Sequence, residues 1–341
     1  MSEVLYRKYR PQSFAEVVGQ EEVVGGLERA IKQGKVAHSY IFAGGRGIGK
    51  TTIARILAKA IGTHSDDIYE LDAASNRGID EIRSLREAVN VLPLHSPYKV
   101  YILDEAHMLT KEAANALLKT LEEPPAHCVF ILATTELDKF LDTVISRCEV
   151  YQFKQPSLSV LIEQIKEITR REKKEISTIS AELVALHGKG SFRDTLSILQ
   201  KVLAGVEKKV DDEMVRQILG VPSGELVHQF IDSLQSKDTN GALLAINEIK
   251  GKNLAADCFC DLVLDSLRKI LLLRFAKALQ EQIKNEVGED EFNYLMGKAN
   301  DAGAGISSVV LAELLKARAQ VEWAAIPELP LELFIINNLS K

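Results

Sequence analysis

The sequence predicts an α/β fold in which a parallel sheet carries helices on both faces, followed by a region made only of helices. Short apolar runs alternate with helical patterns through the first 155 residues, and this order is typical of parallel sheets. The segment 44–51 has the spacing G-x-x-x-x-G-K-T between an apolar strand and a helix, which is the context of a phosphate-binding loop. From residue 156 onward strand patterns disappear and helical patterns continue.

Length and composition limit the class of protein. The 341 residues exceed the usual size of one domain, so we expect two or three. Hydrophobic residues make up 46% and charged residues 26%, as in globular proteins. No apolar run approaches the ~18 residues that span a membrane, so we expect no membrane partner. The net charge of −6 disfavours a protein that coats nucleic acid but is compatible with a ring that presents one basic surface.

The N-terminus and the cysteines favour a cytoplasmic location. Residues 1–4 lack the basic region and apolar core of a secretory signal. We expect the cysteines to be reduced, mostly buried thiols, and the C-x-C spacing of the last two is a weak metal signal. The cysteines are Cys128, Cys148, Cys258 and Cys260.

The phosphate loop follows a predicted helix over 21–32 and a buried strand over 40–43. Its glycines let the backbone wrap around an anion, so that N–H groups and the next helix N-terminus point at phosphate. Lys50 adds a positive charge for the outer phosphates, and the Thr51 hydroxyl is suited to complete a Mg²⁺ shell. The residues expected to contact a nucleoside triphosphate here are Gly44, Gly45, Arg46, Gly47, Ile48, Gly49, Lys50, Thr51 and Thr52.

The remaining strands place further polar residues beside this loop. Strands are expected over 68–73, 99–104, 128–135 and 150–153, and helices over 79–91 and 113–121. Ligands of parallel sheets bind at the carboxyl ends of the strands. We therefore expect 44–51, 104–105 and 134–135 to meet at one edge of the sheet.

Two carboxylates at a buried strand tip are costly unless they serve a cation or a reaction. Beside a phosphate loop, we expect Asp104 to bind Mg²⁺, directly or through water, and Glu105 to orient and deprotonate the attacking water. Thr134 and Thr135 end the neighbouring strand, where a hydroxyl could reach the γ-phosphate or that water.

Three basic features stay open on the residues alone. No acid in the local sequence obviously pairs with Arg147, which is either a surface residue or an arginine that stabilises phosphoryl charge in cis or in trans. Arg193 begins a predicted helix and either pairs near Asp194 or reaches the nucleotide. The basic and aromatic segment 5–11 is either a nucleic-acid patch or a solvated arm.

The helical part divides near residue 220. Helices are expected over 158–171, 180–187, 192–204 and 211–219, and long helical patterns such as 256–279 follow a break at 221–224. We therefore expect a nucleotide-binding domain over 1–155, a helical lid over 156–220 and an all-α domain over 221–341.

These motifs together resemble a known family. The phosphate loop, the two strand-end motifs, Ser-Arg-Cys at 146–148 and Gly-Ser-Phe-Arg-Asp at 190–194 occur in an order that resembles the AAA+ clamp-loader ATPases. More narrowly, segments 5–20, 72–78 and 115–125 closely resemble the gamma/tau subunits of bacterial DNA polymerase III. Replication factor C small subunits are similar but more distant. The resemblance covers essentially the whole chain and is strongest over residues 4–200.

The resemblance implies roles for single residues. Thr135, or Thr134 in its place, matches the first sensor of the γ-phosphate, and Arg193 matches the second sensor, which couples the lid to the nucleotide. Arg147 matches the arginine finger, which acts on ATP bound to the adjacent subunit. The residues that match contacts around the adenine are Arg10, Pro11 and Val18, and Arg77 is a candidate contact to DNA phosphate.

The resemblance also implies a function and partners. The chain would be an ATP hydrolase that uses ATP and Mg²⁺ as the motor subunit of a clamp loader in DNA replication. Its expected partners are delta and delta-prime subunits, other copies of itself, the sliding clamp and primer–template DNA, and residues 225–341 would form the collar of a pentamer. The alternatives are a branch-migration type of DNA motor, or a scaffold subunit with weak ATPase activity; intact Lys50 and Glu105 argue against the scaffold.

Two departures from the family limit what is carried over. The family usually has a four-cysteine zinc module after the phosphate-loop helix, whereas 61–67 is a short link without cysteine, so we expect no zinc. Longer family members continue past the collar into segments that contact helicase and polymerase, and those roles are not carried over to this chain.

Overall fold

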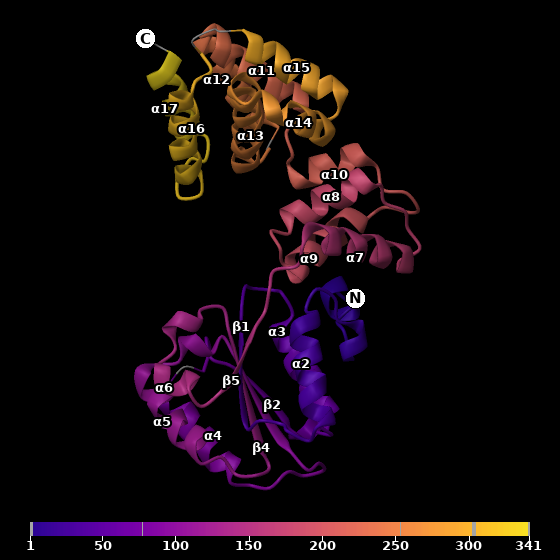
Figure 1. Ribbon diagram of the computed structural model, residues 1–341, viewed down its shortest axis with the longest axis vertical. Coiled ribbons are helices and arrows are strands. Elements are labelled where there is room, and N and C mark those ends of the chain that lie inside the picture. Colours follow the sequence, from indigo (N-terminus) through magenta and orange to yellow (C-terminus); the bar gives the residue numbers. More distant parts are fainter. Residues whose placement is uncertain (1–2, 77, 253, 302–304, 340–341) are drawn as a thin grey trace. The chain divides into compact units, whose positions relative to one another are not determined.

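The computed structural model describes residues 3–76, 78–252, 254–301 and 305–339. The chain forms two compact units, 1–211 and 212–341, and each unit is treated by itself below. The described residues of the N-terminal unit form the sheet and the helices α1 to α9 (Figure 1).

The predicted parallel sheet is confirmed. Its five strands pair in the order β2-β3-β4-β1-β5 and every pairing is parallel. The strands are β1 (Ser39–Ala43), β2 (Ile68–Asp72), β3 (Lys99–Asp104), β4 (Cys128–Thr134) and β5 (Glu149–Gln152). The three central strands are buried almost throughout, which explains their continuous apolar runs.

Helices cover both faces of this sheet, as expected (Figure 1). Alternate strand residues point to opposite faces. Tyr40 and Phe42 of β1 belong to the core beneath α2 and α3. Ile41 of the same strand belongs to the core beneath α4 and α5. The helices of the N-terminal unit are α1 (Leu5–Lys8), α2 (Glu21–Lys32), α3 (Lys50–Ala60), α4 (Ile79–Val89), α5 (Lys111–Glu122), α6 (Asp142–Ile145), α7 (Leu158–Arg171), α8 (Thr178–His187) and α9 (Phe192–Leu203).

Side-chain caps set several helix starts. The Thr110 hydroxyl accepts the backbone N–H of Ala113, so α5 begins at Lys111, two residues before the predicted start. Ser177 caps α8 in the same way. A serine or threonine at this position satisfies an N–H that has no partner inside the helix. The caps were visible in the sequence, and the predicted starts at 113 and 180 overlooked them.

The lid helices α7, α8 and α9 pack together around buried aliphatic side chains, among them Ile165, Val184 and Leu199. The short helix α1 packs against α9, where the backbone N–H of Leu5 donates to Gln200 Oε1 at 3.0 Å. The opening segment of the chain is therefore attached to the lid.

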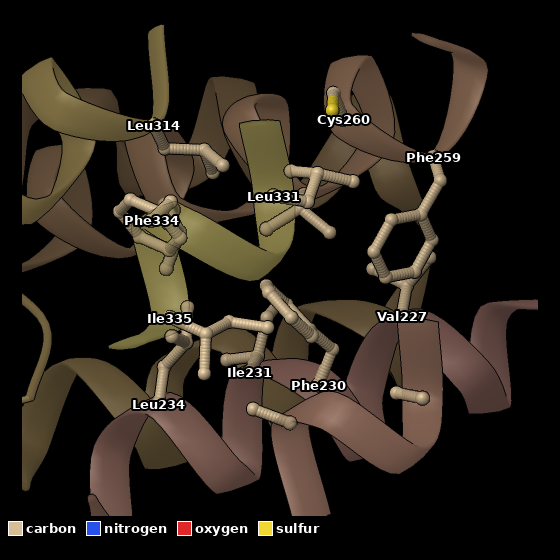
Figure 2. Close-up of a cluster of buried hydrophobic side chains, with 14 of the residues drawn as sticks. Val227, Phe230, Ile231, Leu234, Phe259, Cys260, Leu314, Leu331, Phe334 and Ile335 are labelled. Atoms are coloured by element: carbon tan, nitrogen blue, oxygen red, sulfur yellow. The ribbon is translucent and has the colours of Figure 1, made fainter. Parts of the chain in front are cut away.

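The C-terminal unit is helical in every described element, as predicted. Its core gathers residues from several helices, and Figure 2 shows Phe230 of α11, Phe259 of α13 and Phe334 of α17 among them. The predicted helix over 256–279 stops earlier, at Phe275, before a short 3-10 turn. The helices are α10 (Asp212–Leu219), α11 (Gly224–Ser236), α12 (Thr239–Gly251), α13 (Ala256–Phe275), α14 (Gln280–Val287), α15 (Glu289–Asn300), α16 (Ser308–Val321) and α17 (Leu329–Leu339).

The division into compact units differs from the predicted domain boundary. The units part between residues 211 and 212, ahead of α10, whereas we expected a boundary after residue 220. The carbonyl of Gly220 accepts the N–H of Ala255, a contact within the C-terminal unit. Compact units are not by themselves domains, so the predicted domain boundaries at residues 155 and 220 both stay predictions.

None of the described helices combines the length and the apolar character needed to cross a membrane. All four cysteines lie in described segments and are free thiols; Cys128 and Cys260 are buried, and the other two are partly buried.

Candidate functional site

The carboxyl edge of the sheet brings the predicted segments together. In the parallel register Ala43 of β1 lies beside Thr134 of β4, and the N–H of Gly44 donates to the Thr134 carbonyl at 3.1 Å. The next strand, β3, ends at Asp104 beside β4. The phosphate loop and both strand-end motifs therefore meet at one edge, as the sequence predicts.

The phosphate loop depends on its glycines. Gly44, Gly47 and Gly49 have φ angles of 147°, 71° and 107°, which strain any residue that carries a Cβ. A Cβ on Gly44 would also lie 2.6 Å from the carbonyl oxygen of Phe153. Gly49 directly precedes α3, so the loop delivers backbone N–H groups to a helix N-terminus, which is suited to bind an anion.

Lys50 is held inside this loop. The residue is only 6% exposed, and its Nζ donates to the carbonyls of Gly44 and Gly45, each at 2.7 Å. Burial lowers the pKa of the Lys50 ammonium from its ordinary value, while the carboxylates of Glu105 and Asp104 oppose that shift. The ammonium is thus positioned at the centre of the loop, where a phosphate would meet it.

Thr51 and Asp104 form the oxygen pair expected for a magnesium ion. The Thr51 hydroxyl donates to Asp104 Oδ2 at 2.9 Å. The other carboxylate oxygen, Oδ1, accepts the backbone N–H of Glu105 at 3.1 Å. A hydroxyl and a carboxylate beside a phosphate loop are the hard oxygen ligands that Mg²⁺ uses, so these residues fit that ion.

Glu105 contacts one of the two candidate threonines. Its Oε2 accepts a hydrogen bond from the Thr135 hydroxyl at 3.1 Å. The Thr134 hydroxyl accepts the backbone N–H of Glu136 at 3.0 Å instead, and Thr134 is fully buried. The geometry therefore favours Thr135, the first of our two choices, as the hydroxyl beside the reacting groups.

A pocket of about 900 Å³, counting its part open to solvent, lies over the loop. Arg10, Pro11, Val18 and Arg193 line it as expected. The guanidinium carbon of Arg193 lies 5.9 Å from the centre of the Tyr6 ring, and the backbone N–H of Arg193 donates to the Gly47 carbonyl at 3.4 Å. The predicted residues that line the pocket are Arg10, Pro11, Val18, Arg46, Gly47, Ile48, Gly49, Lys50, Thr51, Thr52, Asp104, Glu105 and Arg193.

Sequence reasoning missed several lining residues. Tyr6 and Tyr9 belong to the segment that the residues alone left open as a nucleic-acid patch or a solvated arm, and both line the pocket. This agrees with the nucleotide wall that the resemblance implies for this segment. Gln164 of α7 and Leu196 of α9 also line the pocket. Their sequence context carried no signal, because the packing of the lid brings them there.

Arg147 does not line this pocket. It follows α6, where its guanidinium donates to the Thr143 carbonyl at 2.7 Å and pairs with Glu122 Oε1 at 2.7 Å. As expected, the partner is not an acid of the local sequence: Glu122 lies on α5, 25 residues earlier in the chain. Both side chains are partly exposed, and exposed pairs of this kind contribute only about 0–1 kcal/mol.

Two expectations remain without a structural test. Arg77, the candidate DNA contact, lies outside the described residues. Within the segments that the structure describes, no three acidic, histidine or cysteine side chains are grouped to hold a metal ion. The expected lack of zinc stays a prediction.

Two family models match the chain. The model described as DNA polymerase III, delta subunit, matches residues 19–77 and 62–157, and the model described as DNA polymerase III subunits gamma and tau domain III matches residues 210–340. The second match covers most of the C-terminal unit.

Curated relatives match almost the whole chain. It is 35% identical to DNA polymerase III subunit tau of Bacillus subtilis over 98% of this chain and 63% of the relative. It is 34% identical to subunit gamma/tau of Mycobacterium tuberculosis over 96% of this chain and 61% of the relative. The chain thus spans less than two thirds of these two proteins. With subunit gamma of Buchnera aphidicola it shares 34% identity over 72% of this chain and 74% of the relative.

Solved structures support the fold. The Thermotoga maritima RuvB Holliday junction branch migration motor aligns with a TM-score of 0.53 and 23% identity, over 66% of this chain and 79% of RuvB. At that identity the likeness concerns the AAA+ fold alone. The curated relatives and the family model that matches residues 210–340 identify the family. The chain belongs to the family of the gamma and tau subunits of DNA polymerase III.

Proposed function

We propose that this chain is an ATP hydrolase and the motor subunit of a replicative clamp loader. The observation that carries the proposal is the arrangement of Lys50, Thr51, Asp104 and Glu105 around one pocket in a chain of this family. Each side chain has a place in phosphoryl transfer, and the order of the motifs is that of the family.

The chemistry follows from these positions. Lys50 and the loop N–H groups bind the phosphates, and Thr51 with Asp104 would hold Mg²⁺, which would supply positive charge for phosphoryl transfer. Glu105 accepts a proton from the attacking water, and its carboxylate is partly exposed to the pocket. Thr135, hydrogen-bonded to Glu105, is the proposed sensor of the γ-phosphate.

The remaining lining residues bind the rest of the nucleotide. Arg10, Pro11 and Val18 form the proposed wall around the adenine. Arg193 lies at the start of α9 and touches the phosphate loop through its backbone, so nucleotide binding and lid position are coupled there.

Arg147 acts on the nucleotide of a neighbouring copy in this proposal. It lies outside the lining of its own pocket and is partly exposed, and its surface ion pair is weak enough to exchange for a phosphate. The proposed assembly contains delta and delta-prime subunits and further copies of this chain. Binding of ATP favours the form that holds the sliding clamp and primer–template DNA, and hydrolysis removes that preference.

Three variants test the shared site. Lys50→Ala should abolish ATP binding, Glu105→Gln should bind ATP and keep only a slow residual turnover, and Arg147→Ala should bind ATP nearly as the parent does while losing stimulated hydrolysis. A mixture of Lys50→Ala and Arg147→Ala chains should regain part of the activity, because the first supplies an intact finger to the intact site of the second. Normal turnover by Arg147→Ala alone would sink the shared-site proposal.

The branch-migration alternative rests on the fold alone, and the family assignment does not favour it. The weak-ATPase scaffold is tested by the same assay, because a scaffold predicts that Glu105→Gln changes nothing.

A further inference from the structure

A buried histidine lies beside the proposed general base. His107 belongs to a 3-10 turn (Ala106–Met108) that follows Glu105, and its side chain is only 6% exposed. The Nδ1 atom lies 3.0 Å from the Thr134 hydroxyl and 3.5 Å from Glu105 Oε2. A buried polar ring of this kind requires partners, and these partners belong to the reacting edge of the sheet.

The other ring nitrogen faces a second carboxylate. His107 Nε2 lies 3.4 Å from Glu136 Oε1, and Glu136 is paired with Lys139 at the surface. The backbone N–H of Glu136 donates to the Thr134 hydroxyl at 3.0 Å. His107 is therefore held from both sides, through the turn that follows β4.

This arrangement restrains one oxygen of Glu105. Both the Thr135 hydroxyl and His107 Nδ1 approach Oε2, and no described residue hydrogen-bonds to Oε1. Glu105 itself has a φ of 49°, and its long side chain has several rotamers available. Contacts on Oε2 from two sides select one rotamer and leave Oε1 for a water molecule.

We propose that His107 is a positioning residue for hydrolysis: it holds the Glu105 carboxylate so that Oε1 receives the proton of the attacking water. This inference rests on the proposed function, because it assigns His107 a role through Glu105. Carboxylates accept hydrogen bonds and do not donate them, so both ring nitrogens of His107 donate in this proposal. Nδ1–H is directed to Glu105 and Thr134 and Nε2–H to Glu136, and the ring does not become a reactant.

Three substitutions separate the two sides of the ring. His107→Leu removes both polar contacts, His107→Asn keeps an amide near the position of Nδ1, and His107→Gln extends an amide toward the position of Nε2. We expect His107→Leu to slow single-turnover hydrolysis by about 10- to 100-fold, the range that small misplacement of a reacting group produces. The affinity for ATP should change less than about threefold, since only the chemical step is affected. His107→Asn should recover most of the rate and His107→Gln little of it.

The control is another histidine of the same sheet. His127 precedes β4 at the opposite edge, where its Nε2 bonds the Val89 carbonyl at 3.0 Å, and His127→Leu should leave turnover unchanged. Thermal unfolding of every variant, followed by circular dichroism, separates a lost contact from a lost fold.

A double substitution decides whether His107 acts through Glu105. In a Glu105→Gln background, His107→Leu should cause no further loss of rate. A further loss of similar size there, or a parental rate for His107→Leu alone, would overturn the inference while leaving the proposed function intact. A parental rate for Glu105→Gln would instead overturn the proposed base, and the inference with it.

Discussion

Gly47 connects the phosphate loop to the lid, and its replacement by alanine gives a worked prediction. Gly47 has a φ of 71°, and a Cβ there would overlap the Ser191 hydroxyl and lie 3.3 Å from the Cβ of Arg193. Ser191 caps α9 by accepting the N–H of Asp194 at 3.2 Å. The left-handed backbone costs alanine about 1–2 kcal/mol, and loss of the cap costs about 1 kcal/mol. Together, backbone strain and the lost cap should destabilise the closed arrangement of loop and lid by roughly 2–3 kcal/mol.

This cost should appear in nucleotide binding. The free Gly47→Ala protein relieves both the overlap and the backbone strain when the loop relaxes and the first turn of α9 moves off it, and a bound nucleotide must restore the closed arrangement. If the whole cost falls on binding, the affinity for ATP drops by roughly 30- to 150-fold, because about 1.4 kcal/mol corresponds to a factor of ten. Titration with a fluorescent ATP analogue measures the change.

Gly205 supplies the matched control. Its φ of 80° is also left-handed, but a Cβ there meets no atom within 4 Å. Gly205→Ala therefore carries the backbone strain without the contact to the lid, and it should bind the analogue as the parent does. Equal affinities for the two variants would refute the argument that Gly47 is required for closure of the lid on the loop.

Two further predictions concern stability and reactivity. Asp67 is buried and accepts hydrogen bonds from the Ser96 hydroxyl and from the N–H groups of Leu94 and His95. Burial alone would raise the pKa of this carboxyl, but the three hydrogen bonds outweigh it and lower the pKa from 3.8 to about 2. Because the pKa is lower in the folded than in the unfolded protein, the ionised carboxylate stabilises the fold above about pH 4, and this contribution is lost as pH falls toward 2. Denaturant titrations across that range should show this loss in the parent and a smaller one in Asp67→Asn. Burial raises the pKa of all four cysteine thiols, to about 11 for Cys128, so iodoacetamide at pH 8 should modify the native protein slowly and the denatured protein fully.

Much of the fold was predictable because periodicity and motif spacing are local. Buried parallel strands are continuous apolar runs, so β1, β3 and β4 stand out from the sequence. The order β2-β3-β4-β1-β5 has no local signal, since it depends on which strands pair. The helix α1 has only four residues, too few for a periodic pattern to be seen.

The candidate site was predictable to the extent that its residues occur in motifs. Lys50 and Asp104 each belong to a motif whose context the sequence displays, and their relation follows from the edge rule for parallel sheets. The pairing of Arg147 with Glu122 and the contact of His107 with Glu136 join different elements. Such contacts appear only when the packing of those elements is known.

The central claim is tested most directly by ATP hydrolysis in the assembled system. The chain would be mixed with delta, delta-prime and sliding-clamp proteins, with and without primer–template DNA, and phosphate release would be followed over time. The account predicts strong stimulation when clamp and DNA are both present, and loss of that stimulation in Arg147→Ala. Binding of ATP with slow turnover that neither clamp nor DNA changes would contradict it.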